Sequence, residues 1–134
     1  MQSTLVDAGP LVALFDGRDK HHPWAVGVLR DEPYPMVTTW PVLAESASML
    51  PTENWIDCLE FIESGGLTVA ELPNATVPDL IRWARKYSDL PMDLGDASLV
   101  VLADRLDTRR IITIDSHFFV YRLRGNRSFD VICP

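Results

Sequence analysis

The stretch PMDLGDASLVVLADRL, residues 91–106, places two carboxylates three positions apart, Asp93 and Asp96, ahead of a long apolar run. Asp93 suits the N-cap of a helix that ends near Leu106, with Asp96 as the acid that often follows a cap three residues later. Ala97 and the valines after it indicate, however, that the turn carrying Asp96 faces the interior. Helix capping and metal binding both stay open for Asp93, whereas the apolar setting of Asp96 favours metal binding over capping.

On both sides of this helix the chain alternates between short apolar strands and helical segments. The signals are β-branched runs for the strands, and proline, threonine or glycine at the ends of the helices. Strands are expected at residues 3–7, 36–39, 67–72, 110–115 and 129–133, and helices at residues 9–16, 23–30, 41–50, 52–64, 76–87 and 93–106. This alternation predicts an α/β fold with a parallel sheet that is covered by helices on both faces.

The 134 residues have a length and composition typical of one globular domain, with 47% hydrophobic and 23% charged residues. No apolar run approaches the roughly 20 residues needed to span a bilayer, and the first ten residues lack the pattern of a secretory signal. Cys58 and Cys133 lie far apart and are expected to be free thiols. We therefore expect a single domain, residues 1–134, in the cytoplasm and away from membranes.

The formal net charge of −7 argues against nucleic-acid binding, which normally requires a basic surface. The argument weakens if several acids are gathered in one site and screened by divalent cations, or if the basic residues share one face. Late in the chain, basic residues do cluster in the sequence: Arg105, Arg109, Arg110, Arg122, Arg124 and Arg127. The charge alone therefore does not exclude an RNA-binding protein.

Four acidic residues stand apart because their neighbours are apolar. Asp7 follows the first expected strand, Glu45 lies in PVLAESASML, Asp96 lies in GDASLVVLAD, and Asp115 follows the strand RIITI. A carboxylate among apolar neighbours is costly to bury unless it is paired, hydrogen-bonded or bound to a metal. In an open parallel sheet, ligands bind beyond the carboxyl ends of the strands, where Asp7 and Asp115 are expected. Joint binding of a hard cation such as Mg²⁺ would explain why carboxylates on four separate elements occur in this setting.

Each of these acids also has a simpler explanation. Asp7 and Asp115 could cap the helical turns that follow them, and Glu45 could be a half-exposed residue on its helix. These explanations do not account for all four acids occurring together at the expected binding edge. No Ser-His-Asp or Cys-His arrangement is apparent, so a covalent nucleophile is not favoured. His117, two residues after Asp115, could reach a substrate at this edge or simply pack on the surface.

The segments DAGPLVALFD, PMDLGDASLVVLADRL and RIITIDSHFFVYR, together with the helix of Glu45, resemble the PIN-domain nucleases in their order and spacing. The resemblance runs over essentially the whole chain and is greatest to the VapC toxins of bacterial toxin–antitoxin pairs. It implies a three-layer α/β/α fold with a small, mainly parallel central sheet of four or five strands.

The resemblance also has implications for individual residues. The catalytic, metal-binding acids of the family correspond here to Asp7, Glu45, Asp96 and Asp115. Asp93 is then an auxiliary ligand or supports the site, and Thr113 matches a hydroxyl position that supports it. The family often has threonine or serine after its first aspartate, whereas this chain has Ala8, so one supporting hydroxyl is missing.

The activity that the resemblance implies is endonucleolytic hydrolysis of RNA with Mg²⁺, or Mn²⁺ as a substitute, by a homodimer that a VapB-like antitoxin silences. RNA backbone contacts are expected from Arg109, Arg110, Arg122, Arg124 and Arg127, which could alternatively form an ordinary solvated surface. A second hypothesis is a PIN-fold module with weak metal affinity that acts by binding RNA or protein, and Ala8 is its best support. A receiver-like phosphoacceptor domain is disfavoured, because it needs an acidic pair after the first strand and a lysine after a late one.

Overall fold

The central sheet is built outward from β1 (Thr4–Val6), whose three residues are all buried. The computed structural model describes residues 2–134. Within them, β2 (Met36–Thr39) and β4 (Arg110–Ile112) flank β1, and β3 (Thr68–Ala70) and β7 (Asp130–Ile132) form the outer strands. Every neighbouring pair is parallel, which gives the strand order β3-β2-β1-β4-β7.

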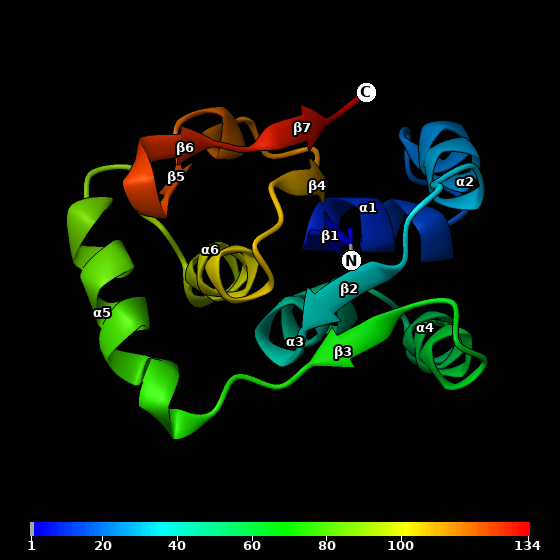
Figure 1. Ribbon diagram of the computed structural model, residues 1–134. Coiled ribbons are helices and arrows are strands. Elements are labelled where there is room, and N and C mark those ends of the chain that lie inside the picture. The colour runs from blue at the N-terminus through cyan, green and yellow to red at the C-terminus, as the bar shows by residue number, and fades with distance from the viewer. Residues whose placement is uncertain (1) are drawn as a thin grey trace.

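Helices cover both faces of this sheet, as Figure 1 shows. They are α1 (Ala8–Phe15), α2 (His22–Arg30), α3 (Trp40–Ser48), α4 (Thr52–Glu63), α5 (Val77–Lys86) and α6 (Leu94–Leu106). In Figure 1, α5 and α6 lie to the left of the sheet, and α2 and α4 lie to its right. The predicted three-layer α/β/α arrangement around a parallel sheet of four or five strands is therefore confirmed.

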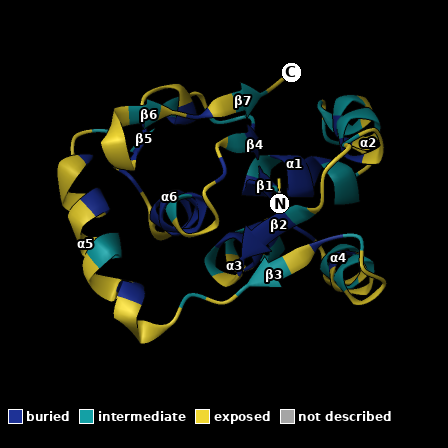
Figure 2. Ribbon diagram, viewed as in Figure 1, coloured by how far each residue is buried: buried dark blue, intermediate teal, exposed yellow. Residues whose placement is uncertain are grey.

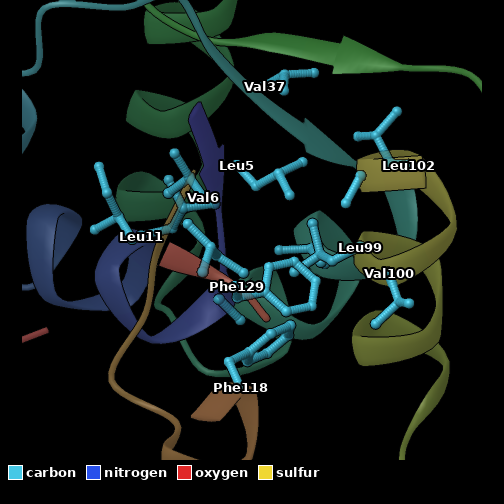
Figure 3. Close-up of a cluster of buried hydrophobic side chains, with 14 of the residues drawn as sticks. Leu5, Val6, Leu11, Val37, Leu99, Val100, Leu102, Phe118 and Phe129 are labelled. Carbon is cyan, nitrogen blue, oxygen red and sulfur yellow. The ribbon is translucent and has the colours of Figure 1, made fainter. Parts of the chain in front are cut away.

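Helix α6 is the most extensively buried of the helices, because every residue from Gly95 to Ala103 is buried. Figure 2 shows the contrast with α5, which is largely exposed on the outer side of α6. Figure 3 shows side chains of α6, among them Leu99 and Leu102, packed in the core with residues of β1. The apolar run after Asp96 thus lies between the sheet and α5. No helix within residues 2–134 is long and apolar enough to cross a membrane.

The predicted stop after α4 is confirmed and depends on two glycines. Gly65 has a φ angle of +93°, a left-handed conformation that glycine adopts at little cost. A Cβ atom at Gly66 would clash with the ring of Phe61, which packs over the turn. The turn between α4 and β3 therefore favours glycine at both positions, for its conformation at Gly65 and for its small size at Gly66.

A short antiparallel hairpin, β5 (Arg122–Leu123) with β6 (Arg127–Ser128), was not expected from the sequence. Each strand has two residues, which is too few for an alternating hydrophobic pattern. The turn itself carries a signal, since Gly125 and Asn126 both have positive φ angles, 75° and 59°.

The strand order reverses at β1, with β2 and β3 on one side and β4 and β7 on the other. Open α/β sheets bind their ligands outside the carboxyl ends of the strands at such a reversal. Asp7 leaves β1 at this edge, and Asp115 follows β4 after two more residues. The sequence expectation that these two acids meet at the binding edge is therefore consistent with the topology.

Candidate active site

The carboxyl edge of the sheet holds a cavity of about 300 Å³ that contains all five of the predicted carboxylates. The acids come from the ends of β1 and β4 and from the helices α3 and α6. The lining residues are Asp7, Ala8, Gly9, Glu45, Met49, Asp93, Asp96, Ile114 and Asp115. Residues that are up to 108 positions apart in the chain are thus gathered around one opening.

Asp7 joins the end of β1 to the start of α1 and is fixed by two hydrogen bonds. Its Oδ1 accepts the backbone N–H of Ala8 at 2.8 Å, and its Oδ2 accepts the hydroxyl of Thr113 at 2.7 Å. The Thr113 oxygen in turn accepts the backbone N–H of Asp115 at 2.9 Å. Burial raises the pKa of Asp7 to about 6, although these hydrogen bonds to its carboxylate oppose the shift.

Because one buried hydroxyl connects two of the acids, we expect Thr113→Val to destabilise the protein by about 2 kcal/mol. The valine keeps the shape of the side chain but leaves the buried Asp7 Oδ2 without its donor and the Asp115 N–H without its acceptor. Urea unfolding followed by circular dichroism measures the change.

The control for this substitution is Thr68→Val, the same change at an exposed position on β3. It should alter the free energy of unfolding by no more than about 0.5 kcal/mol. Equal effects of the two substitutions would contradict the role given to the Thr113 hydroxyl.

Asp93 caps α6 as the sequence suggested, and both Asp93 and Asp96 line the cavity. Asp93 is the N-cap of α6, and its Oδ1 accepts the backbone N–H of Asp96 at 2.8 Å. Asp96 is buried, and its Oδ2 accepts the hydroxyl of the fully buried Tyr121 at 2.9 Å. Burial raises the pKa of Asp96 to about 7, and the neighbouring carboxylates of Asp93 and Asp7 add to the shift.

Glu45 reaches the cavity from α3 and is half-buried. Burial raises its pKa to about 7, with repulsion from Asp93 and then from Asp7 and Asp115 adding to the effect. Glu45 is indeed half-exposed, as the simpler explanation predicts. That explanation does not account for the four other carboxylates that line the same cavity.

Asp115 also has a double role, as the N-cap of the 3₁₀ turn η2 (Ser116–Phe119) and as a wall of the cavity. Its Oδ1 accepts the backbone N–H of His117 at 2.9 Å. The imidazole of His117 lies beside the same carboxylate, with Nδ1 3.5 Å from Oδ1. His117 is therefore at the edge of the acidic site rather than on a remote surface.

Tyr121 is the contact that sequence reasoning missed. It lies in the run HFFVYR, where an apolar pattern predicts only a core residue. Its ring is indeed in the core, but its hydroxyl ends at Asp96 and so orients a site carboxylate. Tyrosine in a buried aromatic run needs a hydrogen-bond partner, which is the one signal that could have pointed to the site.

Arg110 does not lie at the acidic cavity, although it was a candidate for RNA contacts. It begins β4, at the opposite end of the strand from Asp115, and forms a two-pronged ion pair with Glu32 at 3.0 and 3.3 Å. Its guanidinium also lies over the ring of Tyr34. These contacts give Arg110 a structural role at the amino edge of the sheet.

Three of the other candidate arginines also take part in contacts within the protein. Arg122 donates to three backbone carbonyl groups of residues 119–121. Arg124 pairs with Asp79 at 3.1 Å, and Arg127 pairs with Asp107 at 2.9 Å. Arg109 is exposed. RNA binding by these arginines stays a prediction, and their contacts within the protein favour the alternative of a structured, solvated surface.

The donor set of the cavity suits a hard divalent cation. All five side chains offer oxygen atoms, and three of the carboxyl groups have a pKa raised to between about 6 and about 7 by burial and mutual repulsion. A divalent cation among these oxygens removes the cause of the repulsion. The oxygen donors and their electrostatics therefore fit Mg²⁺ or Mn²⁺ better than a soft metal.

Comparisons with known proteins identify relatives of this chain in sequence and in fold. A scan against models of protein families finds no match. The chain is 30% identical over 133 residues to Ribonuclease VapC26 of Mycobacterium tuberculosis, which covers 96% of this chain and 98% of that protein.

Two solved structures share the fold. The crystal structure of VapC20 of M. tuberculosis, described as a sarcin-ricin loop cleaving toxin, aligns with a TM-score of 0.77 at 15% identity, covering 84% of this chain and 90% of that one. VapBC2 of Rickettsia felis, solved bound to a promoter DNA fragment, aligns with a TM-score of 0.60 at 12% identity over 96% and 98% of the two chains. The match to Ribonuclease VapC26, at 30% identity over nearly the whole of both chains, shows that the chain belongs to the VapC family of PIN-domain ribonuclease toxins.

Proposed function

We propose that residues 1–134 form a single PIN domain that hydrolyses RNA endonucleolytically with a divalent cation, and that it is the toxin of a toxin–antitoxin pair. The observation that carries the proposal is the gathering of five carboxylates in one cavity of about 300 Å³ at the reversal of strand order. Membership of the VapC family supports ribonuclease activity, and the oxygen donors support the dependence on Mg²⁺ or Mn²⁺.

In this proposal Asp7, Glu45, Asp96 and Asp115 hold the metal, and Asp93 is an auxiliary ligand. A bound cation of this kind lowers the pKa of water and offsets the negative charge that develops on a phosphodiester. The protein's own contribution is orientation. The Ala8 N–H and the Thr113 hydroxyl fix both oxygens of Asp7, and the Tyr121 hydroxyl fixes one oxygen of Asp96. Attack by water should leave a 5′-phosphate and a 3′-hydroxyl.

We further propose that a VapB-like antitoxin binds this chain, as the name VapBC2 indicates for the R. felis structure. A cavity with five carboxylates attracts a basic segment of a partner, which would compete with the metal and with RNA. We also expect a homodimer, and light scattering behind size-exclusion chromatography measures the mass of the 15.1 kDa chain and of its complexes.

The alternative of a binding module without turnover rests on Ala8, which lacks the hydroxyl that the family often has there. In this chain Asp7 nevertheless receives two donors, from the Ala8 backbone and from Thr113. A hydroxyl at position 8 is therefore not needed to fix Asp7, and this weakens the case for an inactive site. Tight RNA binding without cleavage under any metal condition would support the binding module instead.

The experiment is incubation of antitoxin-free protein with total RNA in Mg²⁺, in Mn²⁺ and in EDTA, followed by mapping of the new 5′ ends. We expect cleavage at defined positions with either cation, loss of cleavage in EDTA, and recovery when excess cation is returned. Cleavage that persists in EDTA would contradict metal dependence. Intact RNA under all three conditions would contradict the enzymatic proposal.

A further inference from the structure

His117 lies close to two of the acids of the cavity, although it is not one of the expected metal ligands. Asp96, Asp115 and His117 each offer one potential ligand atom, and these three atoms lie within 4.8 Å of one another. Asp96 comes from the first turn of α6, whereas Asp115 and His117 come from the segment after β4. Two separate elements thus bring two carboxylates and one imidazole to a common point.

The spacing of the three atoms matches that of ligands around one small cation. Ligands of an octahedral ion at about 2.1 Å are about 3 Å apart when adjacent and about 4.2 Å apart when opposite. A separation within 4.8 Å therefore requires only small side-chain adjustments to reach coordination distances. These adjustments are available because the side chains of Asp115 and His117 are both partly exposed to solvent.

The position of the His117 ring is determined by the core beneath it. Phe118, the next residue, is fully buried and lies next to Phe129 in the core (Figure 3). The His117 ring itself packs at an angle against Tyr121, with the ring centroids 6.1 Å apart. Since Tyr121 also donates to Asp96, a single aromatic side chain contacts both the histidine and one of its two carboxylate neighbours.

An ion pair with Asp115 is the simpler explanation for His117, and the geometry does not favour it. The distance of 3.5 Å between Nδ1 and Oδ1 is longer than a normal hydrogen bond. The same Oδ1 accepts a shorter hydrogen bond from the backbone N–H of His117, at 2.9 Å. By contrast, Nδ1 of His22 lies 2.7 Å from a backbone carbonyl and has an evident structural partner.

We propose that His117 provides a nitrogen ligand on the Asp96–Asp115 side of the metal site and thereby favours Mn²⁺ over Mg²⁺. This inference rests on the proposed metal dependence and adds a residue and a metal preference to it. Imidazole is a better ligand for first-row transition ions than for Mg²⁺, which prefers carboxylate, carbonyl and water oxygens. Loss of the imidazole should therefore weaken Mn²⁺ binding more than Mg²⁺ binding.

Pulsed electron paramagnetic resonance of the Mn²⁺-loaded full chain tests the inference directly, without a measurement of activity. Electron spin echo modulation detects the ¹⁴N nucleus of an imidazole bound to Mn²⁺. We expect this modulation in the native protein, and we expect it to change to a ¹⁵N pattern when the protein is made with ¹⁵N-labelled histidine. The chain has three histidines, His21, His22 and His117, so His117→Ala identifies the ligand and His21→Ala is the matched control.

Calorimetric titrations with Mn²⁺ and Mg²⁺ complete the test. His117→Ala should weaken Mn²⁺ binding by about tenfold or more and Mg²⁺ binding by less than about threefold, whereas His21→Ala should change neither. Failure of the native protein to bind either Mn²⁺ or Mg²⁺ would overturn the proposed function together with this inference, whereas binding of Mg²⁺ alone would overturn only the inference. Mn²⁺ binding without histidine modulation, or with modulation that survives His117→Ala, would overturn the inference and leave the proposed function standing. The isotope comparison needs no substitution, so an absence of histidine modulation would overturn the inference even if His117→Ala fails to fold.

Discussion

Asp96→Asn should reduce RNA cleavage by about a thousandfold or more while making the metal-free protein more stable at pH 8. The loss of cleavage follows from the proposed role of Asp96, because an amide is a weaker ligand than a carboxylate and a group at the reacting centre is worth two to four orders of magnitude. The asparagine oxygen can still accept the Tyr121 hydroxyl, which donates to Asp96 at 2.9 Å. The fold should therefore remain intact.

The gain in stability follows from the electrostatics of the empty cavity. Burial, then Asp93 and Asp7, raise the pKa of Asp96 from 3.8 to about 7. At pH 8 the side chain is ionised in both the folded and the unfolded protein, and only the folded state bears the cost of burying the charge. One pKa unit corresponds to about 1.4 kcal/mol, so the neutral amide should raise the free energy of unfolding by about 2 kcal/mol or more.

Urea unfolding in EDTA and the RNA cleavage assay in Mg²⁺ measure the two effects on the same protein preparation. Asp57→Asn is the matched control, since it makes the same chemical change at an exposed position on α4. The control should keep both activity and stability. A variant at position 96 that loses activity and stability together would indicate that Asp96 supports the fold rather than a metal.

The second large effect concerns pH, and we expect the melting temperature of the metal-free protein to fall by about 10 °C between pH 5 and pH 8. Asp7, with a pKa of about 6, and Glu45 and Asp96, each with a pKa of about 7, all bind protons more tightly in the folded protein than in the unfolded one. Their contribution to stability is complete below the unfolded pKa, near 4, and is lost as the pH rises through 6 and 7. The three groups repel one another, so they should titrate together rather than one by one.

Two comparisons isolate this contribution from other effects of pH. Excess Mg²⁺ or Mn²⁺ at pH 8 should recover most of the lost melting temperature, because a ligand of the folded state stabilises it. Asp96→Asn in EDTA should show a shallower decline over the same pH range than the native protein. A melting temperature that is constant or that rises from pH 5 to pH 8 in EDTA would contradict the raised pKa values and the crowding of charge that causes them.

The parts of this fold that the sequence predicted are those determined by local chemistry. Gly65 and Gly66 end a helix, β-branched residues from Arg110 onward form a strand, and the apolar run after Asp96 forms a buried helix. The site acids could be singled out because their sequence neighbours are apolar, and a carboxylate is costly to bury in such surroundings unless it is paired or bound to a metal. Their meeting at one edge then followed from the rule for parallel sheets together with the family resemblance.

The parts that were not predicted depend on pairings between distant segments. The hydroxyl of Tyr121 donates a hydrogen bond to Asp96, 25 positions away in the sequence. The guanidinium of Arg110 pairs with Glu32, which is 78 positions away. Neither pairing can be predicted from local patterns, because the sequence offers several acidic residues with which each of these side chains could pair. The arginines therefore looked like one basic group, although the fold divides them between the start of β4 and the β5–β6 hairpin.

The burial of α6 from Gly95 to Ala103 has a consequence for how this protein unfolds. The helix that presents Asp93 and Asp96 is enclosed between the sheet and α5 along most of its length. Its amide protons should exchange with solvent only in rare events that separate α5 from the domain or unfold the domain as a whole, because α5 covers its outer side. A protease that attacks frayed segments would consequently find no cleavage point within residues 95–103 until such an event had occurred.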